Sequence, residues 1–317
     1  MVPDLALIEI FDFYMAKVLE FDIVRYNREV WIILAHVCRK WRDIVFGSPQ
    51  RLNMRLYFPA RRSVRAMLDT WPPLPVEIWG RDLRKRKLDN IVAALEHTDR
   101  IHKIELSDDS RSHLEQALAA MLPMQKPFPS LTELQVDFFS EWKRLAVPDL
   151  LLSGSAPLLR SLRLRNIQFP LPLLQNLLPS TTNLVELRIR SIPNSRFISP
   201  EAMVACLSGL NRLEEVELEF ESPRTSTWGS RRLPPSTRCV LPALTLLRFD
   251  GSCEYLEELI SQIDSPLLDN LYVTVFHQPE LDTAQLYIMT QIYAVVVART
   301  HVQFDRYARE NPRGPIN

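Results

Sequence analysis

One pattern of hydrophobic and polar residues recurs along most of the chain: a large aliphatic, two variable residues, an aliphatic, one variable residue and a last aliphatic. The last two aliphatics of each copy are two residues apart, so they point to the same face of a short strand. Seven copies follow one another at intervals of 24 to 31 residues, measured between their central aliphatics: Ile104, Leu134, Leu162, Leu187, Val216, Leu247 and Leu271. Each copy therefore predicts a short strand with one buried and one polar face.

Weaker copies extend the pattern at both ends, and segments of helical period separate the strands. The segment 74–80 fits as an earlier copy with Val76 at its centre, and 301–304 fits as a late one. In three intervening segments the apolar residues recur three or four apart. These stripes are Leu114, Leu118 and Met121; Leu171, Leu174, Leu177 and Leu178; and Leu256, Leu259, Ile260 and Ile263.

A strand and a short helix cannot bury their apolar faces alone, whereas units stacked side by side can. The sequence therefore predicts an α/β fold, with a parallel sheet on the concave face of an irregular stack and helices on its convex face. A doubly wound parallel sheet also alternates strands with helices, but it predicts longer helices and strands that are apolar throughout. The polar residues on one side of each strand favour the stack.

Residues 1–50 lack the repeat and have the spacing of amphipathic helices. A first helix is expected to begin at Pro3, with apolar residues at helical spacing: Leu7, Ile10, Phe11 and Tyr14. A second is expected from Glu29 to Phe46, where apolar residues again fall three or four apart: Val30, Ile33, Leu34, Val37, Trp41, Ile44 and Val45.

The chain thus divides into three parts. Residues 1–50 are the helical module and residues 51–276 are the stacked repeats. In the last part, 277–317, a helix at 281–299 is expected to cap the open end of the stack, followed by a polar tail.

Composition gives no sign of a charged or membrane-bound partner. Among 317 residues, 38 Lys+Arg balance 38 Asp+Glu, so net charge favours neither nucleic acid nor an anionic membrane. Four widely spaced cysteines without a CxxC pair are typical of a reducing compartment. The first residues do not read as a signal peptide, and no apolar run is long enough to span a bilayer. We expect a soluble protein of the cytoplasm or nucleus.

The sequence holds no Walker loop, GxGxxG or GxSxG motif, and its histidines lack metal-ligand spacing. His36 and Cys38 are two apart in the expected second helix and point to different sides, so we interpret Cys38 as a buried, inert thiol. We expect no enzymatic activity, no catalytic residues, no metal and no cofactor. A hidden hydrolase would need convergent titratable groups in a pocket.

Two polar stretches leave alternatives open. The basic run Arg81–Lys87 (RDLRKRK) is either a nuclear-localisation or phosphate-binding patch or a solvated loop between repeats. The stretch Ser222–Arg238, rich in Ser, Thr, Arg and Pro, reads as an exposed loop. In that loop, Trp228 is either a contact for a partner or part of a disordered insertion.

Charged residues lie between the strand aliphatics of three neighbouring copies, and alternation points them to the concave face. They are Arg163, Arg165, Arg188, Arg190, Glu215, Glu217 and Glu219. Adjacent parallel strands lie about 5 Å apart, so Arg188 is expected to reach Glu217. Two interpretations stay open: the charges satisfy one another and keep the surface soluble, or they form a bipolar groove that binds a charged segment of a target protein.

These motifs carry two family resemblances. Over residues 74–276 the repeat resembles the leucine-rich-repeat family, although the family's buried asparagine is not at a constant offset and Asn166 lies one residue early. The first fifty residues resemble an F-box, with an insertion at 15–28. The matching residues are Pro3, the Leu-x-x-Ile-Phe run that ends at Phe11, Val37-Cys38-Arg39-Lys40-Trp41-Arg42 and Ser48-Pro49.

The two resemblances together imply a substrate-recognition subunit of an SCF-type cullin ubiquitin ligase, with the F-box on a Skp-type adaptor and the repeats on an unknown target protein. They imply adaptor-binding roles for Pro3, Leu7, Ile10, Phe11, Val37, Cys38 and Trp41. Each of these is also a candidate for the module's own core, which we favour for Trp41, but so small a module has too little interior for all of them. The alternative is a leucine-rich-repeat interaction scaffold that works independently of ubiquitin ligases.

Overall fold

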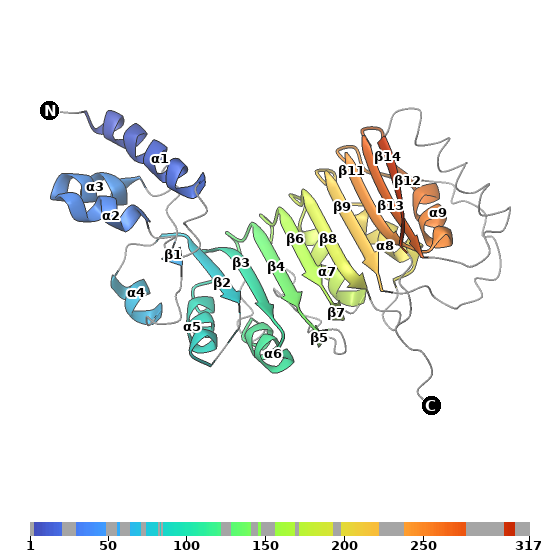
Figure 1. The fold of residues 1–317 in the computed structure, drawn as a ribbon, viewed down its shortest axis with the longest axis horizontal. Coiled ribbons are helices and arrows are strands. Elements are labelled where there is room, and N and C mark those ends of the chain that lie inside the picture. Colours follow the sequence, from blue (N-terminus) through green and yellow to red (C-terminus); the bar gives the residue numbers. More distant parts are fainter. Residues whose placement is uncertain are drawn as a thin grey trace.

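The secondary structure is α/β, as predicted, in a computed structural model that describes most of the chain. A large parallel sheet runs along the molecule, and helices cover one of its faces (Figure 1). The described residues are 3–20, 30–48, 56–57, 64–70, 74–81, 83, 85–121, 128–140, 145–146, 156–168, 171–192, 198–221, 238–276 and 301–307.

Within these residues ten strands form the sheet, all parallel, and their spatial order follows the sequence without reversal (Figure 1). They are β1 (Leu56–Tyr57), β2 (Val76–Arg81), β3 (Ile101–Asp108), β4 (Glu133–Phe138), β6 (Ser161–Arg165), β8 (Glu186–Ile192), β9 (Glu215–Phe220), β11 (Leu246–Gly251), β13 (Asn270–Phe276) and β14 (His301–Tyr307). Two short parallel pairs accompany the sheet: β5 (Leu145–Ala146) with β7 (Ile167–Gln168), and β10 (Cys239–Val240) with β12 (Ile263–Asp264).

The register of the sheet places the predicted central aliphatics in one row. The row runs Ile104, Leu134, Leu162, Leu187, Val216, Leu247 and Leu271, and ends at Val302. At the other end Ile104 lies opposite Ile78, so the predicted central position at Val76 is wrong by two residues. Both aliphatics are buried and two apart, which left the pattern unable to choose between them. The late copy at 301–304 is confirmed as part of β14.

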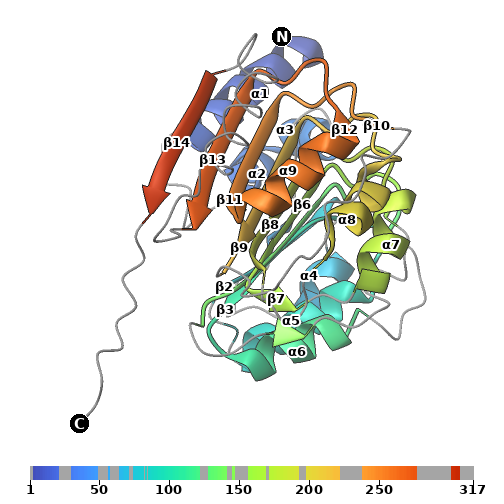
Figure 2. The same ribbon diagram turned by 90° about the vertical axis from the view of Figure 1, so that its right-hand side faces the viewer.

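Helices α5–α9 lie on one face of the sheet, and α4 (Val64–Thr70) packs beside α5 (Figure 2). The five are α5 (Lys85–Leu95), α6 (Arg111–Ala119), α7 (Leu171–Ser180), α8 (Pro200–Leu207) and α9 (Cys253–Gln262). A doubly wound sheet carries helices on both faces and reverses its strand order, whereas the described helices α5–α9 share one face and the strand order follows the sequence (Figure 2).

The predicted apolar stripes form the layer between the helices and the sheet. Fully buried members are Leu114, Leu118, Met121, Leu174, Leu177, Leu178, Leu256 and Leu259. Ile263 was expected to continue the third stripe, but α9 ends at Gln262 and Ile263 begins β12. Each helix is thus about two to three turns long, which suits the short interval between strands.

At the β1 end of the sheet, α1 (Asp4–Glu20), α2 (Val30–Val37) and α3 (Arg39–Gly47) pack together (Figure 1). The prediction of one helix from residue 29 to 46 is wrong, because the backbone at Cys38 is extended (φ −159°, ψ 171°) and separates α2 from α3. The carbonyl of Cys38 accepts the amide of Arg42 at 3.0 Å and so begins α3. The Arg42 guanidinium donates to the carbonyl of Ala35 at 3.1 Å. This carbonyl lies in the last turn of α2, where the helix itself supplies no amide donor.

The sheet continues past the predicted end of the repeats at residue 276. β14 lies within the part expected to hold the capping helix and tail, and it pairs with β13 along seven residues. The predicted helix at 281–299 and the residues after 307 lie outside the described residues.

Candidate functional site

Helices α5–α9 lie on one face of the sheet, and we call the face turned away from them the open face (Figure 2). The strand residues that alternate with the buried aliphatics point to it. All seven residues predicted to bind a target lie on β6, β8 or β9 at positions that alternate with the buried aliphatics. In the ladder, Arg163 lies opposite Arg188, and Arg188 lies opposite Glu217. Two arginines side by side repel each other, so the arrangement of the carboxylates around them decides the character of this face.

Glu186, at the start of β8, is the centre of an ion-pair network. Arg163 donates to both of its carboxylate oxygens, from Nε at 3.0 Å to each and from Nη2 at 2.7 Å. Ser161 donates to the same carboxylate at 2.7 Å, and Arg188 forms an ion pair with it. Sequence reasoning missed Glu186. It lies opposite Glu215, which was selected, so the aligned copies mark it as another residue of the open face.

The arginines of β8 bind the carboxylates of β9. Arg188 donates to Glu215 at 3.0 Å and lies 3.7 Å from Glu217, so the predicted Arg188–Glu217 contact is confirmed as an ion pair. Arg190 donates to both oxygens of Glu217, at 2.8 and 2.9 Å. Most of the predicted residues therefore pair with one another, as the first of the two interpretations expects.

The network keeps Glu186 ionised. Burial raises the pKa of this carboxyl group, but hydrogen bonds from Arg163 and Ser161 and the charges of Arg163 and Arg188 lower it more, so the pKa of Glu186 lies below its ordinary value. The bond to Glu186 likewise raises the pKa of Arg163, against the effect of burial. Charge-assisted bonds of this kind fix the orientation of the guanidinium groups.

Two of the seven predicted residues, Arg165 and Glu219, stand outside the network. Among the described residues no ion pair reaches either side chain. Arg165 is exposed, and its guanidinium carbon lies 5.7 Å from the centre of the Phe139 ring. Phe139 follows β4 and is 51% exposed. Sequence reasoning did not select it, because it comes after the last aliphatic of its copy.

In the N-terminal module, the predicted adaptor-binding residues divide into a buried and an exposed set. Leu7 and Phe11 are buried, and the half-buried Trp41 packs on Phe11 with ring centroids 4.7 Å apart. These three belong to the module's own core, the role favoured for Trp41. The exposed set is Pro3, Ile10, Val37 and Cys38. The interpretation of Cys38 as a buried thiol is therefore wrong, because the residue lies at the break between two helices.

The module exposes more large apolar side chains than the sequence motif indicated. Ile10, Phe13 and Tyr14 are spaced three and four apart and share one face of α1, and Ile33 and Val37 share one face of α2. Phe13, Tyr14 and Ile33 were not among the predicted adaptor-binding residues, because these helices are apolar on more than one face. We call Ile10, Phe13, Tyr14, Ile33 and Val37, which are 39–67% exposed, the module's exposed apolar face. Leu5 is 68% exposed but lies nine residues before Tyr14, on the opposite side of α1.

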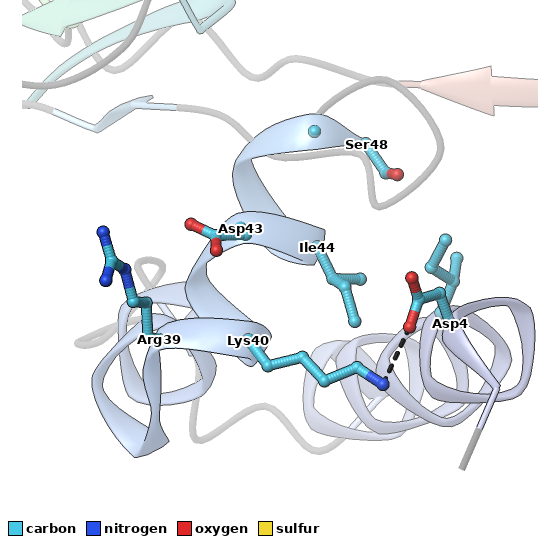
Figure 3. Close-up of a pocket in the computed structure, with 8 residues that line it drawn as sticks. Asp4, Arg39, Lys40, Asp43, Ile44 and Ser48 are labelled. Atoms are coloured by element: carbon cyan, nitrogen blue, oxygen red, sulfur yellow. Dashed lines mark ion pairs between the residues drawn. The ribbon is translucent and has the colours of Figure 1, made fainter. Parts of the chain in front are cut away.

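An open pocket of about 570 Å³ lies between α1 and α3 (Figure 3). Lys40 of α3 reaches Asp4 of α1 in an ion pair of 2.9 Å, and the side chain of Ile44 points between the two helices. The ion pair joins α3 to the start of α1, and the pocket is lined by the same two helices. We therefore interpret the pocket as a gap between packed helices of the module.

The basic run Arg81–Lys87 spans the end of one element and the start of the next. Arg81 ends β2, Lys85 begins α5, and the fully buried Leu83 between them donates its amide to Asp108 at 2.6 Å. This stretch is therefore not one solvated loop. The side chains of residues 84–87 lie outside the described residues, as does Trp228 with the rest of segment 222–237.

Chemistry-bearing groups are few in the part of the chain that the structure describes. No group of three or more His, Cys, Asp or Glu side chains there is arranged to hold a metal ion. Burial raises the pKa of the Cys206 and Cys239 thiols, which disfavours the reactive thiolate. None of the described helices has both the length and the apolar composition needed to cross a membrane.

Comparison with protein-family models and with curated proteins identifies no relative. No protein-family model matches the chain, and no curated protein matches it. The open face and the exposed apolar face are therefore the basis for a functional inference.

Proposed function

We propose that this chain is the non-catalytic substrate-recognition subunit of an SCF-type cullin ubiquitin ligase. In this proposal residues 1–50 are an F-box that docks on the Skp-type adaptor. The sheet and helices after it are an irregular leucine-rich-repeat solenoid whose concave surface is the open face. That face binds a target protein and holds its lysines at high effective concentration near the ubiquitin-charged enzyme carried by the cullin.

The exposed apolar face of the module is the observation that carries this proposal. The module buries Leu7, Phe11 and Trp31 in its own core and still leaves six large apolar side chains exposed. Large apolar residues exposed on a small module are typical of a protein-binding site. Spacing of three and four along a helix is also how helical anchors are presented to a partner. The resemblance of residues 3–49 to an F-box supplies the identity of that partner.

The character of the open face supports the second half of the proposal. Its strands are held in one register by the buried aliphatic row, so its polar side chains project from a rigid support. Carboxylates neutralise most of its arginines, an arrangement that disfavours nucleic acid, which needs unpaired cations for its phosphates. A protein segment with both charged and apolar side chains suits such a face better.

Retention of a Skp-type adaptor by the full-length chain tests the proposal. The wild-type chain, co-expressed with the adaptor, is expected to retain it through purification. The Ile10→Asp, Phe13→Asp double variant is expected to lose it, because charges on a contact face cost at least about 2 kcal/mol, or roughly 30-fold in affinity. Leu267→Asp, at a residue 56% exposed in the turn before β13, is the matched control and keeps the adaptor.

The variants were chosen for exposure, because Leu7 and Phe11 are core residues whose replacement disturbs the fold itself. Undiminished adaptor binding by the double variant argues against docking through this face. A folded wild-type chain that binds no Skp-type adaptor favours the alternative, an interaction scaffold outside any ubiquitin ligase.

A further inference from the structure

The arginines of the open face differ in how their charges are satisfied. Arg81 lies 3.6 Å from Glu105, and Arg248 lies 3.9 Å from Glu217. Arg165 has no carboxylate at such a distance among the described residues. All three guanidinium groups lie 5.0–5.7 Å from the centre of an aromatic ring: Arg81 over Trp79, Arg165 over Phe139 and Arg248 over Tyr272.

The two residues beside Arg165 in the sheet are bonded to other side chains. Asp137 of β4 lies opposite it in the ladder, but this carboxylate accepts a hydrogen bond from Gln135 at 2.6 Å. On the other side lies Arg190, whose guanidinium is committed to Glu217. Arg165 therefore forms no ion pair with its neighbours among the described strands, and its guanidinium donors can bind a partner's carboxylate.

Phe139, beside Arg165, carries an exposed ring on a backbone that hydrogen bonds hold in place. Its amide donates to the carbonyl of Asp108 at 2.9 Å. The side-chain amide of Asn166 donates to the carbonyls of both flanking residues, Phe138 and Ser140. The backbone on either side of the ring is thus held to the next strand unit. An arginine beside an aromatic ring on a backbone that is already held in place has the composition of a binding hot spot.

We propose that Arg165 and Phe139 anchor the target by selecting an acidic side chain on it. This inference rests on the proposed role of the open face in target binding. A Glu or Asp of the target accepts two hydrogen bonds from the guanidinium, and an apolar neighbour packs on the exposed ring. A phosphoryl group fits less well, because it is bound by clusters of arginines and Arg163, Arg188 and Arg190 are already bonded to glutamates.

Selection of random peptides displayed on phage against the full-length chain tests the anchor. The wild-type chain is expected to enrich peptides with Asp or Glu beside an apolar residue. Arg165→Gln is expected to abolish that preference, and Arg165→Glu to turn it toward Lys or Arg. Arg160→Gln removes an exposed arginine at the amino end of the same strand, and as the matched control it keeps the wild-type preference.

Synthetic copies of an enriched peptide then measure the chemistry. Replacing the selected acid by Gln is expected to weaken binding to the wild-type chain at least about tenfold, the scale of one charged hydrogen bond. The same replacement leaves binding to the Arg165→Gln chain unchanged, and phosphoserine at that position binds no tighter than Glu.

The anchor is overturned if no peptide is enriched, if the enriched peptides lack an acid, or if Arg165→Gln enriches the same set. Tighter binding of phosphoserine also overturns the acidic assignment in favour of phosphoryl recognition. Adaptor binding by the wild-type chain is measured separately. Acid-selective peptides without adaptor binding therefore count against the ligase role alone.

Discussion

Arg163 and Glu186 meet across neighbouring strands in a bidentate pair, with Nε of the arginine 3.0 Å from each carboxylate oxygen and Nη2 at 2.7 Å from one of them. Glu186 is 9% exposed, so water competes little for this carboxylate. Hydrogen bonds in such surroundings are stronger than on an open surface. The centre of the open face is therefore a fixed pattern of charge, and in the proposed role its side chains need no ordering before a target binds.

Glu186→Gln is expected to lower the free energy of unfolding by about 1–3 kcal/mol, because Arg163 and Arg188 lose a charged acceptor in a buried position. Urea titration followed by circular dichroism measures the change. Glu219→Gln removes a carboxylate outside the network and is expected to stay within about 0.5 kcal/mol of the wild type. Equal effects of the two substitutions would contradict the central place given to Glu186.

Acid is expected to weaken the fold through Glu186 and Asp108. Burial raises the pKa of Asp108. Hydrogen bonds from the backbone amides of Ser110 and Leu83 and with the side chains of Asp109 and His113 lower it by more, so the pKa of Asp108 lies below the ordinary 3.8. Both carboxylates thus stabilise the fold when ionised, fully above the unfolded-state pKa values and less as pH falls through the lowered ones. The free energy of unfolding should decline below about pH 4.5, and less steeply in Glu186→Gln.

Asn166 combines a left-handed backbone, φ 58°, with side-chain bonds to the preceding strand unit. Asn166→Gly accepts that backbone but loses the bonds, whereas Asn166→Ala loses the bonds and adds a steric cost of about 1–2 kcal/mol. Both variants should unfold at a lower urea concentration than the wild type, and the alanine variant at the lowest. The reverse order would show that backbone conformation contributes little at this residue.

Phe11 and Phe13 separate the core of the module from its exposed apolar face. Phe11 is fully buried and Phe13 is 67% exposed. Phe11→Ala is expected to cost about 3–5 kcal/mol, the range for a buried phenylalanine, and Phe13→Ala less than about 1 kcal/mol, because most of its side chain is exposed. Thermal unfolding of the two variants checks this contrast. Similar losses would place both rings in the core and remove Phe13 from the exposed apolar face.

The register of the sheet was predictable because a slip of one residue would turn a strand's aliphatics out of the core. The same alternation placed all seven charged residues on one face. It predicted the Arg188–Glu217 pair but not the others, because the long side chain of Arg190 reaches Glu217 diagonally and Arg188 is shared among three carboxylates. Side-chain reach of that kind has no signature in spacing.

The N-terminal module shows why the rest could not be predicted. Val37 and Trp41 keep helical spacing across the break at Cys38, so periodicity alone continues the helix through it. Along α1, the exposed Ile10 and Phe13 are as apolar as the buried Leu7 and Phe11. Only the packing of α1 against its neighbours decides which of its faces is left for a partner.

Calorimetric titration of the purified full-length chain with a purified Skp-type adaptor tests the central claim most directly. The account predicts saturable one-to-one binding whose heat becomes more negative with temperature, the mark of apolar burial, and that is lost in the Ile10→Asp, Phe13→Asp variant. A folded wild-type chain that gives no binding at any temperature would contradict it.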